Sequence, residues 1–411
     1  MEERNETKEL QSARRSRKRN GRKSLLPLVL LFALVAVILG LWYRQFGPSR
    51  TSISENSLFG VQGDEVAVLY NYELQSDKAV LENGSVYLPL TLVKREMNQR
   101  FYWDKDEKCL VYAAPGGVRT FTAEEVDTEG KPLFFVKDQA LYLSLPLLRE
   151  FTNVRTEAYT DGEVKRLFVE TAPESDEVRA TKHKTVLRSR PSVRGSIVTV
   201  AAKAEALRVI PDHADAKTDT ARWVRVKTDS GFTGYVQQRS LAAAETVPYQ
   251  NSFAAQDYGT LSLGGKVLLG FHLVSNQAAN QGLSTLVGNA SGMNVIVPTW
   301  FSLRGNEGDY QSYADRAYVE AAHEKGLKVF ALLDNFDKSV TTGELLKKTS
   351  VRKKLIDSLM ADADLYGFDG INVDLELIKQ EAVDQYLEFI RELSVACHAK
   401  QLYLTVDVPN P

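Results

Sequence analysis

The pattern of hydrophobic and polar positions changes several times along this chain of 411 residues. Residues 25–43 are apolar or uncharged throughout, and residues 64–243 alternate short β-type runs with turns. From Lys266 onward, apolar runs of strand length alternate with longer segments of helical spacing. The pattern therefore predicts a multidomain chain with an N-terminal transmembrane helix, two small β-containing domains and an α/β domain.

The apolar segment 25–43 predicts a transmembrane helix. No charged residue lies between Leu25 and Tyr43, and a helix of that length rises about 28 Å, close to the hydrocarbon thickness of a bilayer. A cleaved signal peptide is the alternative, but the segment is longer than a usual signal core and no small-x-small cleavage pattern follows it. The basic run "RRSRKRNGRK" predicts a cytoplasmic tail over 1–24. We expect a linker over 44–63 and a single-pass protein of the cell membrane, with all later domains extracytoplasmic.

Residues 64–172 contain a faint internal repeat. The segments 85–112 and 140–170 each show a strand, "VYLPL" or "LYLSL", then a short amphipathic helix, then a hairpin with "DKDE" or "TDGE" at its turn. The pair resembles the repeats of the copper amine oxidase N-terminal-like domain, a module of exported bacterial proteins. No His or Cys cluster here would bind copper. The favoured interpretation is an α+β repeat domain that serves as a spacer or protein-interaction module.

Residues 178–243 carry the pattern of a small β-barrel. The segments "VLRSRPSVRGSIVTVAAKAEALRVI" and "RWVRVKTDSGFTGYVQQRSL" hold several short strands separated by turns. They resemble a bacterial SH3-like domain, a family whose members often hold cell-wall peptides or glycans, so the resemblance implies the cell wall as a partner. Trp223 and Tyr235 are candidates for an aromatic contact surface. For Trp223 a place in the core is the favoured interpretation.

Strand-like and helical runs alternate over the last part of the chain, from about residue 265 to 411. The strand-like runs are 266–274, 294–303, 328–336, 370–377 and 402–408. The helical pattern before the fourth run ends at Gly367, which is a typical helix cap. Strand–helix alternation with short connections predicts a parallel sheet, either open or closed into a barrel.

The fourth strand-like run, "GINVDLEL", places polar residues in an apolar stretch. Alternate residues of a strand share a face, so its apolar residues would point one way and Asn372, Asp374 and Glu376 the other. In a parallel barrel this polar row rises towards the C-terminal end of the strand, where barrels keep their active sites. Two alternatives stay open: a purely structural role, and a Mg²⁺ or Ca²⁺ site completed from neighbouring strands. The candidate ligands for that metal are Asp334, Asp337 and Asp407.

The sequence "DGINVDLE" (369–376) resembles the active-site signature of glycoside hydrolase family 18 at all of its positions. Asn372 stands where Asp is commoner, and Leu375 replaces a frequent Trp. The resemblance implies a partial (β/α)8 TIM barrel of about five strands over 265–411. It also implies substrate-assisted, retaining hydrolysis of a β-linked N-acetylglucosamine-containing polysaccharide, peptidoglycan or chitin-like, with no cofactor.

The same resemblance assigns roles to residues. Glu376 would be the general acid, Asp374 would orient the substrate acetamide whose oxygen attacks the sugar, and Asn372 would hydrogen-bond to Asp374. Asp369 and Gly370 are expected to be structural. Weaker substrate-binding candidates lie at the ends of neighbouring strands. These are Trp300, for stacking on a sugar ring, and Asp334 and Asn335, for binding hydroxyl groups.

Composition and length limit the partners, the cysteine chemistry and the size of the barrel that can be expected. The 51 basic residues nearly balance the 53 acidic ones, so no nucleic-acid partner is expected. The two cysteines, Cys109 and Cys397, form neither a disulfide framework nor a metal-site spacing. Residues 265–411 are fewer than the about 250 of a complete barrel, and the Tyr and Trp that the family carries on its later strands are missing. We therefore expect a C-terminally truncated glycosidase; the alternative is a non-catalytic wall-binding or scaffold protein with a degenerate barrel.

Overall fold

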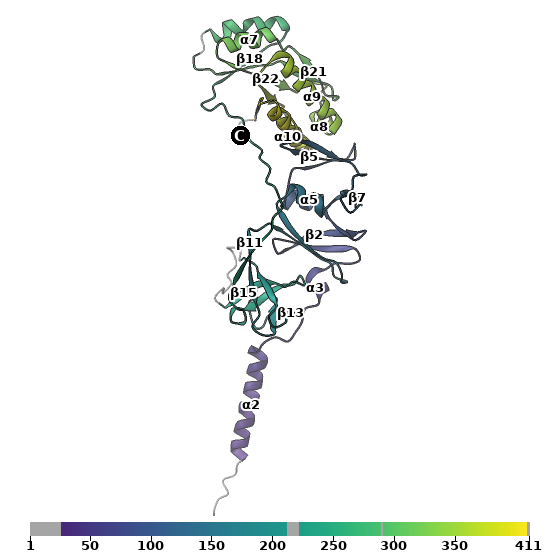
Figure 1. Ribbon diagram of the computed structural model, residues 1–411, viewed down its shortest axis with the longest axis vertical. Coiled ribbons are helices and arrows are strands. Elements are labelled where there is room, and N and C mark those ends of the chain that lie inside the picture. Colours follow the sequence, from purple (N-terminus) through teal and green to yellow (C-terminus); the bar gives the residue numbers. More distant parts are fainter. Residues whose placement is uncertain (1–25, 212–221, 289–290, 409–411) are drawn as a thin grey trace, which may run out of the picture. The chain divides into compact units, whose positions relative to one another are not determined.

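The computed structural model describes residues 26–211, 222–288 and 291–408 (Figure 1). The predicted cytoplasmic tail lies outside the described residues. The chain divides into two compact units: residues up to Leu58 with Ser175–Pro248 form unit 1, and Phe59–Glu174 with Tyr249–Pro411 form unit 2. The segments predicted as a repeat domain and as a barrel domain therefore belong to the same unit.

Helix α2, Leu26–Phe46, occupies the segment predicted to cross the membrane and continues a few residues beyond it. Its large apolar side chains are exposed from Leu28 onward. Leu28–Phe46 is long and apolar enough to cross a membrane, although a signal sequence meets the same criteria.

The segment predicted as a linker contains regular structure. Ser49 N and Ile53 N donate hydrogen bonds to the backbone carbonyls of Val193 and Ile197. The short helix α3, Glu55–Phe59, follows. Composition does not reveal this structure, because the pairing uses backbone groups.

Residues 175–248 of unit 1 form a seven-stranded sheet in the order β13-β12-β16-β15-β14-β11-β17. Its elements are β11 (Ser175–Ala180), β12 (Thr185–Arg188), β13 (Ile197–Ala201), β14 (Ala206–Val209), β15 (Trp223–Lys227), β16 (Thr233–Gln237), the 3-10 helix η1 (Gln238–Ser240) and β17 (Glu245–Pro248). Leu187, Leu207, Val226 and Val236 make its small core. Trp223 is only 8% exposed, which confirms the core interpretation for this residue.

Residues 59–174 of unit 2 form two sheets, in the orders β7-β8-β3-β2-β1-β10-β9 and β4-β5-β6. Their elements are β1 (Glu65–Tyr70), β2 (Glu73–Glu82), β3 (Ser85–Pro89), α4 (Leu90–Glu96), β4 (Phe101–Asp104), β5 (Cys109–Ala114), β6 (Gly117–Phe121), β7 (Phe134–Lys137), β8 (Ala140–Ser144), α5 (Leu145–Phe151), β9 (Val154–Tyr159) and β10 (Arg166–Thr171). Each copy of the repeat shows the expected order, β3-α4-β4-β5 and β8-α5-β9-β10. The strand–helix–hairpin pattern is confirmed.

The remaining part of unit 2 is built on a parallel sheet. Its strands are β18 (Leu269–His272), β19 (Val295–Pro298), β20 (Phe301–Arg304), β21 (Asp309–Ser312), β22 (Lys328–Asp334), β23 (Gly370–Asp374) and β24 (Tyr403–Val406). Strand β22 pairs in parallel with β19 and β20 on one side and with β23 on the other, while β18 and β24 pair with the outer strands. The predicted run 294–303 is two strands rather than one, because β20 turns to pair with the antiparallel strand β21.

Helices cover one face of this sheet (Figure 1). The helical elements are η2 (Gln277–Gly282), α6 (Leu283–Val287), α7 (Arg316–Glu324), α8 (Thr342–Leu346), α9 (Thr349–Tyr366), η3 (Gln380–Ala382) and α10 (Val383–Ala399). Strand residues Leu333 and Ile371 share a core with the helix residues Leu359 and Phe389. Helix α9 ends at Gly367 with φ 79°, which confirms the predicted glycine cap.

Candidate active site

The polar residues of β23 face away from the helices, as the alternation predicts. Ile371 and Val373 are buried in the core that the helices form, so Asn372 and Asp374 between and after them point to the other face. In the parallel register, Asp374 lies beside Asp334, the last residue of β22. The two carboxylates therefore meet at the C-terminal edge of the sheet.

Gly370 opens the strand at a position that has no room for a side chain. A Cβ at this position would lie 2.6 Å from Tyr403 O and 2.9 Å from Phe330 Cδ1. The glycine of the motif therefore allows β23 to lie close to both neighbouring strands. This is the structural use expected for Gly370.

Glu376 lies beyond the strand. Strand β23 ends at Asp374, and Glu376 follows in a loop with an exposed side chain. The expectation that all three polar residues form one row on the strand is wrong for Glu376. The main chain of Glu376 is nevertheless held: Asn335 Oδ1 accepts from Glu376 N at 2.9 Å, and Asn335 Nδ2 donates to Glu376 O at 2.9 Å.

Asn372 is completely buried and contacts β24 rather than Asp374. Its Nδ2 donates to Thr405 Oγ1 at 3.0 Å and to Asp407 Oδ1 at 3.1 Å. The predicted hydrogen bond to Asp374 is therefore not formed, because parallel pairing places Asn372 beside Thr405. Asn372 Oδ1 has no hydrogen-bond partner among the described residues, and a buried unpaired acceptor is costly.

The pKa of Asp374 is shifted by its surroundings in the site. Partial burial, together with the negative charges of Asp407, Glu376 and Asp334, raises the pKa of Asp374 to about 6. A carboxyl group with this pKa exists in both protonation states near neutral pH. Such a group is a candidate for a role in proton transfer or in binding a polar substrate group.

Asp334 and Asn335, the two predicted hydroxyl-binding residues, lie next to Asp374 and Glu376 respectively. Asp334 is 6% exposed, and its Oδ1 accepts from Ser302 Oγ at 2.8 Å and from Phe336 N at 3.1 Å. Asn335 also donates to Thr342 Oγ1 at 2.7 Å. The structure thus brings both residues to the candidate site, where Asn335 acts on the main chain of Glu376.

Trp300 belongs to the core and not to the sheet edge. Its side chain is completely buried, and its indole Nε1 donates to Asn280 Oδ1 at 2.9 Å. Tyr318 and Phe368 pack against the ring. The expectation that Trp300 stacks on a sugar is wrong for this structure, because no face of the ring is accessible.

Asp369 lies at the opposite end of β23 from the candidate site. Burial opposes its ionisation, but the hydrogen bonds from Lys328, Val329 N and His323 outweigh burial and hold the pKa of Asp369 below its usual value. The carboxylate therefore joins the start of β22 to the start of β23. This agrees with the structural role expected for it.

Two residues near the site were not among the predicted site residues. Asp407 raises the pKa of Asp374 and accepts from Asn372, although the sequence pointed to Asp407 only as a metal ligand. Burial, then Asp407 and Asp374, raises the pKa of Tyr386 on α10. The "TVD" at the end of β24 repeats the alternation that marked β23, and this signal would have identified Asp407.

The alternative of a metal site gains nothing from the placement of Asp337. Its carboxylate accepts from Ser339 and pairs with Arg304 at 3.0 Å, so it is engaged elsewhere. Among the described residues, a set of three side chains spaced to share a metal ion occurs at Asp104, Glu107 and Cys109, and not at the end of β23.

Part of unit 1 matches a known family. Residues 184–242 match the family described as "Bacterial SH3 domain". This agrees with the resemblance predicted for 178–243, and the matched residues include β12 to β16 of the sheet of unit 1.

Comparison with known proteins finds glycosidases at low identity. The chain is 25% identical over 123 residues to an uncharacterized glycosylase, YvbX, of Bacillus subtilis (strain 168), and this match covers 28% of the chain and 36% of that protein. Similar solved structures include the C-terminal domain of a putative chitinase from Desulfitobacterium hafniense DCB-2, with a TM-score of 0.31, 18% identity and coverage of 34% of this chain and 45% of that one. The spore cortex-lytic enzyme SleL of Bacillus megaterium QM B1551 has a TM-score of 0.30, 16% identity and coverage of 40% and 38%. The chain thus spans about a third to a half of the length of the proteins that it matches.

Proposed function

We propose that this chain belongs to a membrane-anchored, extracytoplasmic glycosidase that cleaves a β-linked N-acetylglucosamine-containing glycan. The observation that carries the proposal is the arrangement at the end of β23. Asp374 lies beside Asp334 in the register, and Glu376 follows at the exposed rim with its main chain fixed by Asn335. The low-identity match to a glycosylase supports the same reaction class.

The chemistry follows from the positions of the two acids. Glu376 is exposed, so a glycan lying over the sheet edge can receive its proton on the glycosidic oxygen as the bond to the sugar breaks. The oxygen of the substrate's own acetamide forms the new bond to the anomeric carbon, giving an oxazolinium ion. Glu376, now a carboxylate, then takes a proton from the water that opens this ring, and the configuration is retained.

Asp374 orients the acetamide of the substrate. Its carboxylate would accept a hydrogen bond from the acetamide N–H, which becomes positively polarised when the acetamide oxygen attacks. The raised pKa of about 6 means that this carboxylate is ionised in most molecules above neutral pH. Asp334 and Asp407 flank Asp374 and keep the local potential negative, which suits a cationic transition state.

The cell wall is the proposed location of the substrate. The bacterial SH3 domain at 184–242 would hold wall peptides or glycans, and α2 would anchor the chain with its N-terminus in the cytoplasm. Peptidoglycan is therefore preferred over chitin as the substrate, and no cofactor is required.

The test is hydrolysis of an N-acetylglucosamine oligomer and of purified peptidoglycan by the full chain in detergent. Glu376→Gln should lose at least about 100-fold in rate, since removal of a general acid costs that much. Glu324→Gln, at an exposed glutamate on α7, is the control and should retain full activity. Equal activity in both variants would contradict the proposal. If both variants bind peptidoglycan and neither hydrolyses it, a non-catalytic wall-binding scaffold is favoured instead. The match to the bacterial SH3 domain is the observation that supports this alternative.

A further inference from the structure

The β4–β5 hairpin caps helix α9 of the same compact unit. Asp104 is 1% exposed, and its Oδ2 accepts from Thr349 N and from Thr349 Oγ1, both at 2.7 Å. Its Oδ1 accepts from Asp106 N at 3.0 Å and Glu107 N at 2.9 Å. The side chain of Lys348, at the N-cap position of α9, makes no capping hydrogen bond. The carboxylate that satisfies the first turn of α9 therefore comes from a residue 245 positions earlier in the chain.

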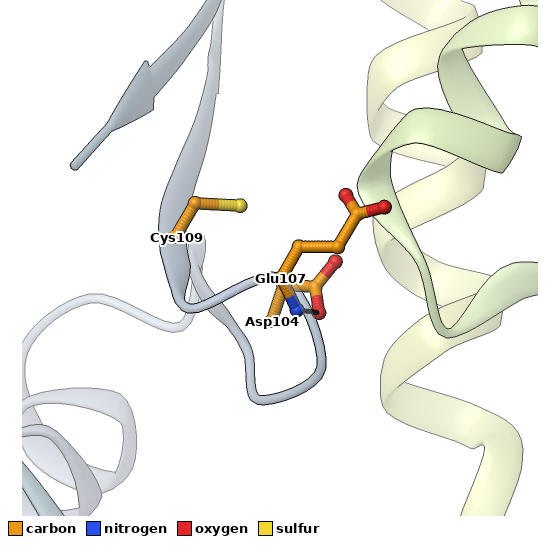
Figure 2. Close-up of side chains that lie close together, drawn as sticks. All are labelled: Asp104, Glu107 and Cys109. Carbon is orange, nitrogen blue, oxygen red and sulfur yellow. Dashed lines mark hydrogen bonds between the residues drawn. The ribbon is translucent and has the colours of Figure 1, made fainter.

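Glu107 extends the same contact by one residue. Its carboxylate accepts from Ser350 N at 2.9 Å and from Ser350 Oγ. Figure 2 shows the carboxylates of Asp104 and Glu107 projecting from the hairpin turn, with Cys109 beside them. The spacing of these three side chains would suit a metal ion, but hydrogen bonds from α9 and from the backbone of the hairpin already occupy the carboxylate oxygens. Capping of a helix N-terminus accounts for the cluster.

A buried ion pair lies directly behind this cap. Arg352 is completely buried and donates to Glu392 Oε1 through Nε at 3.0 Å and through Nη2 at 2.8 Å. The ring of Tyr102, on β4, lies 4.6 Å from the guanidinium carbon, and Tyr102 Oη donates to Lys347 O at 3.2 Å. The hairpin therefore covers charges that would be partly solvated without it, and a buried ion pair is stable only while all its partners are in place.

The capped helix leads back to the candidate site. The chain passes from Asp334 through a loop into α8 and then into α9. Thr342, the first residue of α8, accepts the hydrogen bond from Asn335, which in turn holds Glu376. A Cβ at Gly343 would lie 3.0 Å from Ala382 Cβ, so α8 is tightly packed on η3. Movement of the start of α9 would therefore reach the loop that supports Glu376.

The geometry points to residues 59–174 as a clamp that holds α8 and α9 in place, with Asp104 as a positioning residue for the candidate site. On this account the segment is an integral part of unit 2 and not a spacer. The clamp goes beyond the proposed glycosidase function and does not depend on which reaction the site performs.

The reactivities of the two cysteines distinguish local opening of the clamp from global unfolding. Cys109 lies in the hairpin, with Sγ 3.6 Å from Thr349 Oγ1, whereas Cys397 lies on α10 in the core of the parallel sheet. Both are buried, at 7% and 1% exposed. Opening of the contact between the hairpin and α9 exposes Cys109 alone, while global unfolding exposes both thiols.

The experiment is thiol labelling of the full chain in detergent, with each cysteine followed by mass spectrometry. Asp104→Ala should raise the labelling rate of Cys109 by at least about tenfold and leave that of Cys397 unchanged, because only local opening is promoted. Asp104→Asn keeps an acceptor oxygen and should restore most of the protection. Asp127→Ala is the matched control, since Asp127 Oδ1 accepts from Glu129 N and Lys131 N within its own loop.

Hydrogen exchange on the same variants tests the link to the site. Asp104→Ala should lose amide protection over residues 335–352, and Asp127→Ala should not. The proposal is overturned if Cys109 labelling in Asp104→Ala matches that in Asp127→Ala. It is also overturned if Cys109 and Cys397 gain reactivity together in both Asp104 variants, because Asp104 would then stabilise the whole fold without positioning α9.

Discussion

The side chain of Asn335 forms hydrogen bonds with both polar groups of the Glu376 main chain, the N–H and the C=O. Asn335 Oδ1 accepts from Glu376 N, Asn335 Nδ2 donates to Glu376 O, and both distances are 2.9 Å. The proposed acid lies outside the sheet, so its position depends on this one amide side chain and on the strand that precedes it. An exposed loop residue held in this way can reach a glycan and still be placed accurately.

Asn335→Ala should therefore lower the hydrolysis rate by about 10- to 100-fold, the cost of a small misplacement of a catalytic group. The amide of Glu376 should at the same time lose protection against hydrogen exchange. Asn306→Ala is the control, because Asn306 Oδ1 accepts from Thr341 N, in the loop that follows Asn335, rather than from Glu376 N. Unchanged exchange at Glu376 would contradict the account of this contact.

Asp374 should make the protein less stable as pH rises. Its folded-state pKa of about 6 is above the ordinary value of 3.8, so the native state binds more protons than the unfolded state between these values. The contribution of Asp374 to the unfolding temperature should fall between about pH 4 and about pH 6, so the curves of the wild type and of Asp374→Asn should diverge over this range. Parallel curves for the two proteins would show that Asp374 does not titrate in this way.

Glu388 on α10 should also make the protein less stable as pH rises, over a higher pH range than Asp374. Glu388 is completely buried, and Glu388 Oε1 has no hydrogen-bond partner among the described residues. Burial, and then the charge of Glu392, raises the pKa of Glu388 to about 7 from an ordinary value of 4.5. Stability should fall as pH rises from about 5 to about 7, and Glu388→Gln should remove that part of the fall. Thermal unfolding as a function of pH measures this fall in stability, with Glu324→Gln as control. A fall in Glu388→Gln as large as that in the control would contradict the prediction.

Gly370→Ala tests the close contact at the start of β23. The added Cβ would meet Tyr403 O at 2.6 Å, a backbone atom that cannot move independently of its strand. The free energy of unfolding should fall by about 1–3 kcal/mol, the usual cost of overpacking. Gly265→Ala, where a Cβ meets nothing within 4 Å, should leave it unchanged. Urea unfolding of both variants gives the comparison, and equal stability would show that the strands adjust.

Local pattern was sufficient to predict much of this fold. Apolar runs of strand length located β22, β23 and β24, and Gly367 marked the end of α9, because backbone geometry and burial leave their signal within a few residues. The pairing of Asp374 with Asp334 also follows from parallel strands that end together.

Other features depend on contacts between distant residues. Trp300 at a strand end has the same local pattern whether it is buried or exposed, and only the packing of Tyr318 and Phe368 shows that it is buried. The apolar residues after Asp374 extended the predicted strand past its real end. The capping of α9 by Asp104 joins residues 245 positions apart, so no local pattern could indicate it.

The most direct measurement of the central claim compares two substrates in Glu376→Gln. A dinitrophenyl glycoside of N-acetylglucosamine has a leaving group that departs without protonation, whereas an N-acetylglucosamine oligomer needs a proton from the acid. Release of dinitrophenol in the first turnover should stay within about tenfold of the wild-type rate, while oligomer cleavage should fall by about 100-fold or more. Equal losses on both substrates, or no loss on either, would contradict the assignment of Glu376 as the general acid.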